Sequence, residues 1–153
     1  MAAPESISDL ETHLGYWLRF VSNHVSHAFR LKVEAHGVTV AEWVVMRALL
    51  DTDGINPSRL AERIGMTRGA ISKLVDRLAS KDLVQCRTQK ADRRFQTVAL
   101  TLAGRKMVPA LAKLADQNDQ AFFGHLRKSQ RAELAALLKE IVHEHGLKNV
   151  PLD

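Results

Sequence analysis

Small, hydroxyl and basic side chains are concentrated in residues 67–77 of the chain. They are Thr67, Arg68, Gly69, Ser72, Lys73 and Arg77. Arginine can donate two parallel hydrogen bonds to the edge of guanine, and hydroxyl and lysine side chains commonly bond phosphate oxygens. Residues of these types at the start of a helix could therefore read a DNA major groove, and Arg68 is the best candidate for a guanine contact.

Two of these residues also have a simpler explanation. Thr67 is an ordinary helix cap residue, although caps often donate to phosphate as well. Arg77 lies one turn beyond Lys73, where it could reach phosphate or instead form a salt bridge around Asp76 or with the segment that follows. The sequence leaves both alternatives open.

The positive charge of the chain is local. Between Arg59 and Arg94 there are ten basic and four acidic residues, a net charge of +6, whereas the whole chain carries +5. Everything outside this segment therefore sums to −1. A concentrated basic segment is typical of a phosphate-binding surface, and the alternative is an ordinary solvated charged face.

A two-stranded ribbon is predicted directly after the basic helix. Leu83 to Thr88 and Gln96 to Leu100 both alternate apolar and polar side chains, and the residues between them form its tip. Arg93 and Arg94 in that tip could enter a DNA minor groove, and Lys90 could contact the backbone. The simpler explanation is that the tip arginines only solvate the turn.

Cap sequences predict the helices that position these residues. They are the Thr-x-x-Glu capping box of Thr39 and Glu42, Asn56 followed by Pro57, Thr67, and Thr101. These caps predict three helices in succession. The first runs from about Thr39 to Leu50, the second ends at Gly65, and the third runs from Thr67 to about Ser80. The last of these has an inward face of Ile71, Leu74, Val75 and Leu78. Two short helices and a ribbon in this order are the plan of a winged helix-turn-helix.

Three longer helices surround this segment. Apolar residues at helical spacing predict a first helix from about Ser8 to about Ala35, a fifth after Thr101 and a sixth after Ser129. At 153 residues the chain is expected to be one domain, residues 1–153, with a winged helix-turn-helix DNA-binding region at 39–101. The predicted fold class is mainly α with a small two-stranded β wing.

Composition and motifs exclude several classes of protein. We find no phosphate-binding loop, nucleophile elbow or zincin motif, so an enzyme is not expected. No apolar run approaches the roughly 18 residues of a membrane span, and no secretion signal is recognisable at the N-terminus. Cys86 is the single cysteine, which rules out an internal disulfide. A cytoplasmic protein is expected, with no membrane partner and no cofactor.

The motifs of the chain resemble those of the MarR/SlyA family of winged helix-turn-helix transcription regulators. The residues that carry the resemblance are Leu60-Ala61, the segment 70–78 (Ala-Ile-Ser-Lys-Leu-Val-Asp-Arg-Leu), Asp92-Arg93-Arg94, and the segment 98–104 (Val-Ala-Leu-Thr-Leu-Ala-Gly). The order of the predicted elements also matches this family over nearly the whole length of the chain.

The resemblance implies a homodimer that binds a pseudo-palindromic operator in double-stranded DNA. Residues 8–35 and 102–147 would form its helical dimerisation region. By the same resemblance Asp92 orients one of the tip arginines through an ion pair. The implied function is a sequence-specific DNA-binding transcription regulator, a dimeric repressor that a small-molecule effector releases from DNA.

One position departs from the family's pattern. The family usually has glycine after the lysine that ends the recognition helix, because that residue adopts a left-handed conformation, whereas this chain has Asp82. Aspartate tolerates positive φ better than most residues. We therefore expect the same turn here, with some strain.

Aromatic and histidine side chains of the first two helices form a candidate effector pocket. They are His13, Tyr16, Trp17, Phe20, His24, Trp43 and Met46. Apolar residues at helical spacing more often belong to a core or a dimer interface, which is the favoured interpretation for Trp17, Phe20, Trp43 and Met46. The alternative is a ligand pocket to which the histidines and Tyr16 contribute polar contacts.

Three further alternatives belong to other mechanisms. His24 with His27, and His143 with His145, are pairs rather than the three or four ligands of a zinc site, so a metal-responsive regulator is disfavoured. A redox switch would need Cys86 to be exposed and activated. A winged helix can also be a protein-interaction module without sequence-specific DNA binding, but the basic segment favours DNA.

Overall fold

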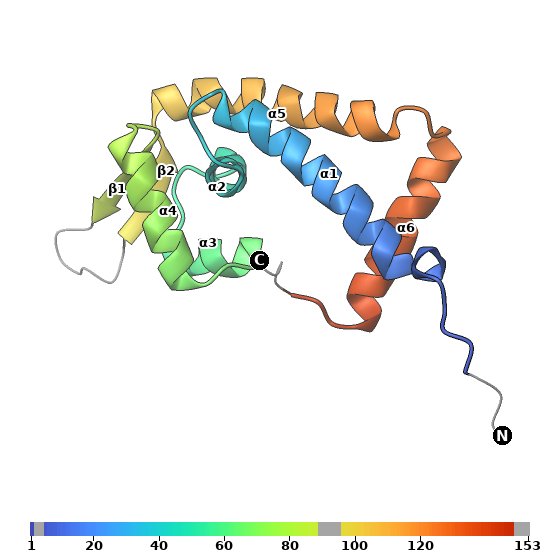
Figure 1. Ribbon diagram of the computed structural model, residues 1–153. Coiled ribbons are helices and arrows are strands. Elements are labelled where there is room, and N and C mark those ends of the chain that lie inside the picture. Colours follow the sequence, from blue (N-terminus) through green and yellow to red (C-terminus); the bar gives the residue numbers. More distant parts are fainter. Residues whose placement is uncertain (2–4, 89–95, 149–153) are drawn as a thin grey trace.

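A computed structural model of the chain describes residues 1, 5–88 and 96–148, and it is mainly α with one small sheet (Figure 1). The elements are α1 (Leu14–Glu34), α2 (Val40–Leu50), α3 (Pro57–Ile64), α4 (Arg68–Ser80), β1 (Val84–Thr88), β2 (Gln96–Leu100), α5 (Leu102–Phe123) and α6 (Lys128–Glu144). The predicted fold class and the order of its elements are confirmed.

The predicted caps account for the starts of four helices. Each cap side chain accepts a hydrogen bond from a backbone N–H of the first turn, which satisfies a donor that has no partner within the helix. The pairs are Thr39 with Glu42 at 3.1 Å, Asn56 with Ser58 at 2.8 Å, Thr67 with Ala70 at 3.1 Å and Thr101 with Gly104 at 3.1 Å. Gly65 ends α3 at a φ of 69°, where a residue without Cβ has no steric penalty.

Two predicted helix starts were wrong. The first helix does not begin near Ser8, because a short 3-10 helix (Leu10–Thr12) precedes α1 and His13 between them is extended. The Trp17 indole donates to the carbonyl of Glu11 at 2.8 Å, which ties this turn to α1. The sixth helix begins before Ser129, at Lys128, and the Gln130 side chain accepts from the backbone of Arg127.

The wing is an antiparallel pair of strands. The two strands lie where the alternating pattern predicted a ribbon, and their register places Val84 opposite Leu100 and Thr88 opposite Gln96. Ile55 and Val98 exchange two backbone hydrogen bonds of 3.1 and 2.9 Å, so the loop before α3 joins the sheet. The tip of the wing, residues 89–95, lies outside the described residues.

The hydrophobic core lies mainly in residues 39–101, which form the winged part of the chain. Its largest fully buried side chains come from α2, α3, α4, β2 and α5, and they are Met46, Leu49, Leu60, Ile71, Leu78, Val98, Val108 and Leu111. Trp43 is also buried, so Trp43 and Met46 belong to the core, as the favoured interpretation held. The first turns of α5 are therefore part of the winged body.

A polar contact connects α1 with α5, which lie side by side in Figure 1. Asn118 of α5 is 3% exposed and donates to the backbone carbonyl of Val25 at 3.1 Å. Its amide oxygen accepts from the Lys32 ammonium at 2.8 Å. This buried amide fixes the register of the two helices, because any slip would leave its polar atoms without partners.

The expected left-handed residue after α4 is observed. Asp82 has a φ of 60°, and the backbone N–H of Leu83 donates to Leu78 at 3.0 Å as the chain turns into β1. The Thr101 hydroxyl donates to the carbonyl of Asp82 at 2.7 Å, so the residue that caps α5 also holds this turn. A Cβ on Gly104 would collide with the carbonyl of Leu83, which explains a glycine at this close approach.

Candidate nucleic-acid interface

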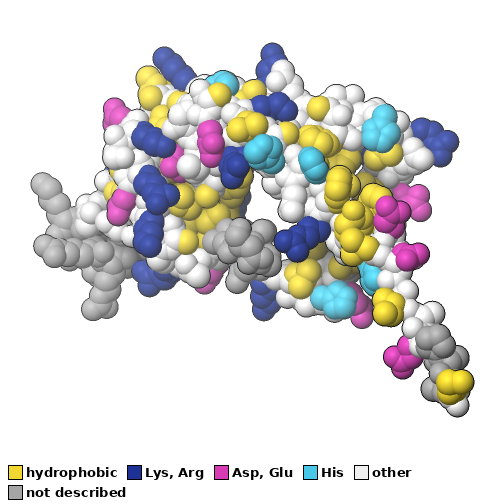
Figure 2. Space-filling view, in the orientation of Figure 1, with side chains coloured by type: hydrophobic (Ala, Val, Ile, Leu, Met, Phe, Trp, Pro, Cys, Tyr) yellow, Lys and Arg dark blue, Asp and Glu magenta, His cyan; other side chains and the backbone are white. Residues whose placement is uncertain are grey.

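Helix α4 presents two chemically distinct faces. The inward face is buried and apolar, as predicted, and consists of Ile71, Leu74, Val75 and Leu78. The opposite face is exposed and includes the polar and small residues expected to meet DNA, which are Arg68, Gly69, Ser72, Lys73 and Arg77. Lys and Arg side chains gather over α4 in Figure 2. The packing of the inward face therefore fixes which side chains project outward.

The basic residues of this face are not equivalent. Lys73, Arg77 and Lys81 follow one another at intervals of four residues, so they form one row along the helix. Lys73 and Arg77 make no ion pair with another described residue, so the salt bridge considered for Arg77 is not found in this part of the chain. Lys81 lies 2.7 Å from a carboxylate oxygen of Glu42, which neutralises its charge.

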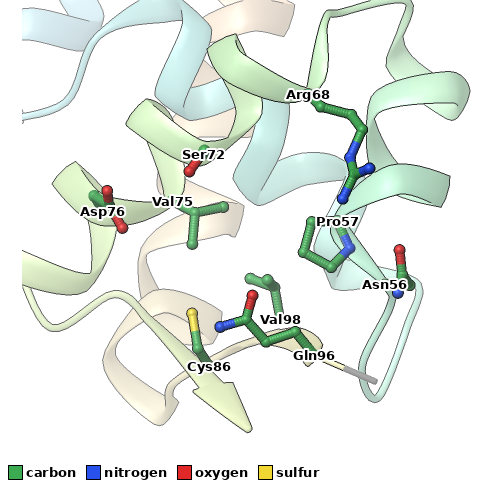
Figure 3. Close-up of a pocket in the computed structure, with 9 residues that line it drawn as sticks. All are labelled: Asn56, Pro57, Arg68, Ser72, Val75, Asp76, Cys86, Gln96 and Val98. Carbon is green, nitrogen blue, oxygen red and sulfur yellow. The ribbon is translucent and has the colours of Figure 1, made fainter. Parts of the chain in front are cut away.

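A cavity of about 280 Å³ lies between α4, the start of α3 and the wing. It is lined by Asn56, Pro57, Arg68, Ser72, Val75, Asp76, Cys86, Gln96 and Val98 (Figure 3). Arg68 extends toward Pro57 and Ser72 lies on α4 beside Val75, so two residues of the predicted DNA surface also line this partly open cavity. Sequence reasoning missed this cavity, since its walls come from segments far apart in the chain.

Cys86 lies in this cavity wall on β1. Partial burial raises the pKa of the Cys86 thiol, and the negative charge of Asp76 raises it further. A thiol with a raised pKa is protonated at neutral pH and reacts slowly with oxidants. Cys86 is exposed, but the shift of its pKa is opposite to the activation that a redox switch would need, so the redox alternative gains no support here.

The predicted effector residues separate into two groups. Tyr16, Trp17, Phe20 and His24 form an aromatic cluster along α1, with ring centroids 5.2 Å apart for the first pair and 5.0 Å apart for Phe20 and His24. Trp17 and Phe20 are 45% and 50% exposed in the single chain, and His13 precedes them at the start of the helix. Trp43 and Met46 lie instead in the core.

Lys90, Asp92, Arg93 and Arg94 lie outside the described residues. Within the part of the chain that the structure describes, no three His, Cys, Asp or Glu side chains come together as metal ligands. None of the described helices is both long and apolar enough to span a membrane.

Two short helices joined by a tight turn, with a polar face on the second and a two-stranded wing beside it, define the winged helix-turn-helix class of DNA-binding proteins. A family model described as the MarR family matches residues 36–94. The transcriptional regulator HosA of Escherichia coli O157:H7 is 27% identical over 117 residues, which cover 76% of this chain and 87% of HosA.

Solved structures share the fold of this chain. The C80S mutant of MarR from E. coli, complexed with operator DNA, superposes with a TM-score of 0.76 at 25% identity and covers 88% of this chain and 99% of that one. BpsR of Bordetella bronchiseptica superposes with a TM-score of 0.77 at 24% identity, over 89% of this chain and 97% of BpsR. The DNA binding of BpsR is regulated by 6-hydroxynicotinic acid. Residues 36–94 of the chain are thus similar to the MarR family of transcription regulators, and its overall fold is shared with solved members of that family.

Proposed function

We propose that this regulator is a cytoplasmic homodimeric repressor that binds a pseudo-palindromic operator in double-stranded DNA and is released by a small-molecule effector. The observation that carries the proposal is the exposed polar and basic face of α4, which its buried apolar face holds beside the wing. A helix supported in this way can enter a major groove while the wing reaches the flanking minor groove.

Each residue of the interface has a proposed role. Arg68 donates to guanine, and Gly69 allows the backbone to approach the bases closely. Thr67, Ser72, Lys73 and Arg77 contact base edges or phosphates along the same groove. In the wing, Arg93 and Arg94 enter the minor groove, Asp92 orients one of them, and Lys90 contacts phosphate.

The dimer proposal rests on apolar surface that the single chain leaves exposed. Helix α6 buries no residue, yet Leu134, Leu137, Leu138, Ile141 and Val142 recur on one of its faces. Helix α1 exposes a similar set, Leu14, Trp17, Leu18, Phe20, Val21 and Leu31. Surfaces of this extent mark an interface, and a second copy would cover both helices. Residues 8–35 and 102–147 are accordingly proposed as the dimerisation region.

Two places could receive the effector. The first is the predicted group on α1 and α2, of which Tyr16, Trp17, Phe20 and His24 would line a pocket completed by the partner subunit. The second is the cavity beside α4, where the Arg68 guanidinium suits an anionic ligand. A ligand there would engage Arg68 and Ser72 and so compete directly with DNA.

The test is selection of bound duplexes from a random pool, followed by affinity measurements at several salt concentrations. We expect enrichment of an inverted repeat, and log K should fall with log salt with a slope of about −5 to −7 if three or four phosphates meet each subunit. Arg68→Ala should cost about 1 to 3 kcal/mol and relax one base position in each half-site, whereas Lys90→Ala should weaken all sequences alike.

A flat salt response or the absence of any enriched sequence would instead favour a protein-interaction module. A reporter gene placed behind the enriched operator distinguishes repression from activation. Release by candidate aromatic acids, measured on the same operator, tests the effector. Loss of that release in Arg68→Ala, assayed at protein concentrations that still saturate DNA, would locate the effector beside α4.

A further inference from the structure

The carboxylate of Glu42 is the most deeply buried charge in the described part of the chain. Glu42 is 1% exposed, and Asn118 is the only other buried polar residue there. Its backbone N–H donates to the Thr39 hydroxyl at 3.1 Å, and its side chain accepts from the Thr39 N–H at 3.3 Å. The capping box alone would leave most of this carboxylate without partners, and an unpaired buried charge is strongly unfavourable.

Lys81, which follows the last residue of α4, supplies the missing partner. Its ammonium donates to Glu42 Oε2 at 2.7 Å and also to the backbone carbonyl of Gly37 at 2.8 Å. Gly37 lies in the turn that follows α1, where its φ is 82°. One side chain thus joins three places: the end of the recognition helix, the start of α2, and the turn through which α1 enters the winged part.

This arrangement separates Lys81 from Lys73 and Arg77. All three are basic and follow one another at intervals of four residues, so charge and spacing alone do not distinguish them. Two of the three N–H bonds of the Lys81 ammonium point to protein acceptors, and one of these acceptors carries a full negative charge. A neutralised, internally bonded ammonium has little to offer a DNA phosphate, whereas Lys73 remains available.

We propose that Lys81 is a positioning residue for DNA recognition, which holds the end of α4 at a fixed angle to α1 rather than contacting DNA. The proposal deepens the function proposed above and rests on it. It assigns Glu42 and Gly37 as the groups through which Lys81 acts.

The physical reason is the directionality of the contact. The apolar face of α4 supplies most of the packing energy, but apolar contacts restrain rotation and tilt of a helix only weakly compared with short charge-assisted hydrogen bonds. In a dimer, the two recognition helices must enter major grooves about 34 Å apart. The hydrogen bonds of Lys81 between α4 and the turn after α1 therefore set the orientation of each recognition helix relative to α1 in the dimer.

The experiment compares Lys81→Met with the matched control Lys73→Met on the full-length chain. Both variants replace one lysine of the same row with an apolar side chain of similar length. The probes are the operator enriched from the random pool by the wild-type protein, a scrambled duplex of the same composition, and operators with one base pair inserted or deleted at the centre. Affinity is measured as a function of salt.

We expect the two variants to fail in different ways. Lys81→Met should lose about tenfold on the operator, leave the scrambled duplex and the salt slope unchanged, and discriminate less between the operator and its spacing variants. Lys73→Met should weaken all duplexes and reduce the salt slope by about 1 for each subunit.

A second pair of variants links the effect to Glu42. Glu42→Gln keeps an acceptor for the Thr39 N–H but removes the charge that holds the lysine. If Lys81 acts through this carboxylate, the double variant with Lys81→Met should bind the operator no worse than Lys81→Met alone. Lys81→Gln, which keeps a donor for Gly37, should recover part of the lost affinity. Denaturant unfolding of each variant is measured first.

The outcomes that overturn the proposal are specific. A reduced salt slope for Lys81→Met would show that Lys81 contacts phosphate. Unchanged operator affinity in folded Lys81→Met, or unfolding of both Lys81 variants, would show that the contact is only structural. If the wild-type protein enriches no operator, the proposed function falls and the positioning role falls with it. If an operator is found and only the Lys81 expectations fail, the proposed function stands.

Discussion

The winged part of the chain and its helical part handle apolar side chains in opposite ways. In residues 39–101 the large apolar residues of α2, α3 and α4 are buried or partly buried, and Leu49, Leu60 and Ile71 are fully inaccessible. Helix α6 buries nothing, and α1 buries Val33 alone. The winged part buries its apolar side chains within one chain, whereas α1 and α6 leave apolar side chains exposed.

The same contrast appears in the local signals of the sequence. Four helix starts around the winged part carry side-chain caps, whereas the structure gives no side-chain cap hydrogen bond at the start of α1. Caps stabilise a helix before it finds a tertiary partner, so the winged part can be specified locally. Helices α1 and α6 gain their stability mainly by packing, part of which the single chain does not supply.

The largest effect is expected from an apolar deletion in the winged core. Leu49→Ala removes a fully buried side chain and should lower the free energy of unfolding by about 2 to 5 kcal/mol. The matched control is Leu102→Ala on α5, which is 71% exposed and should change stability by less than about 0.5 kcal/mol. Denaturant titration measures both, and similar losses would mean that buried and exposed apolar side chains do not differ in stability as described.

A charge introduced among the exposed apolar residues of α6 should weaken dimerisation without affecting the winged part. Ile141→Glu should weaken dimerisation at least about 100-fold, or roughly 2.7 kcal/mol, because the carboxylate would be buried against the partner. Ala136→Glu introduces the same charge on the opposite face of α6 and is the matched control. Sedimentation equilibrium gives both constants, and equal dimerisation of the two variants would place the interface elsewhere.

The features that could be predicted from the sequence are those that depend on residues close together in the chain. Caps and helical spacing predicted α2, α3 and α4 almost to the residue, because both depend on neighbours within a turn or two. The positive φ of Asp82 was predicted from a motif. The partners of Glu42 could not be predicted, because Lys81 is far away in the sequence and has the same charge and spacing as Lys73 and Arg77. The start of α1 was missed because the Trp17 contact with Glu11 competes with helix extension.

The wing arginines test whether the winged part also completes the DNA surface. Replacing Arg93 and Arg94 together by Ala should reduce operator affinity about tenfold, or about 1.4 kcal/mol, without changing thermal stability or dimerisation. The reason is the loss of minor-groove and phosphate attraction. Asp92→Ala should reproduce part of this loss. Tighter binding by Asp92→Ala, measured by titration of the operator, would show that Asp92 does not orient an arginine.

The smallest effect concerns the turn at Asp82, the one non-glycine residue with positive φ among the described residues. Asp82 has a φ of 60°, a conformation that costs non-glycine residues about 1 kcal/mol or more. Asp82→Gly removes this cost but adds freedom to the unfolded chain worth about 0.4 to 1 kcal/mol, so the net stabilisation should be only about 0.5 kcal/mol. For a chain of this size such a change raises the melting temperature by about 1 to 2 °C.

Two further substitutions at this position separate backbone strain from charge. Asp82→Ala keeps Cβ but loses the polar side chain that eases positive φ, so it should be less stable than the wild type, whereas Asp82→Asn should lie close to it. The expected order of melting temperatures is therefore Gly, then Asp and Asn, then Ala. If the melting temperature of Asp82→Ala equalled that of Asp82→Gly, removal of the carboxylate rather than relief of strain would explain the increase over the wild type. The positive φ of Asp82 would then carry no measurable cost in the turn between α4 and β1.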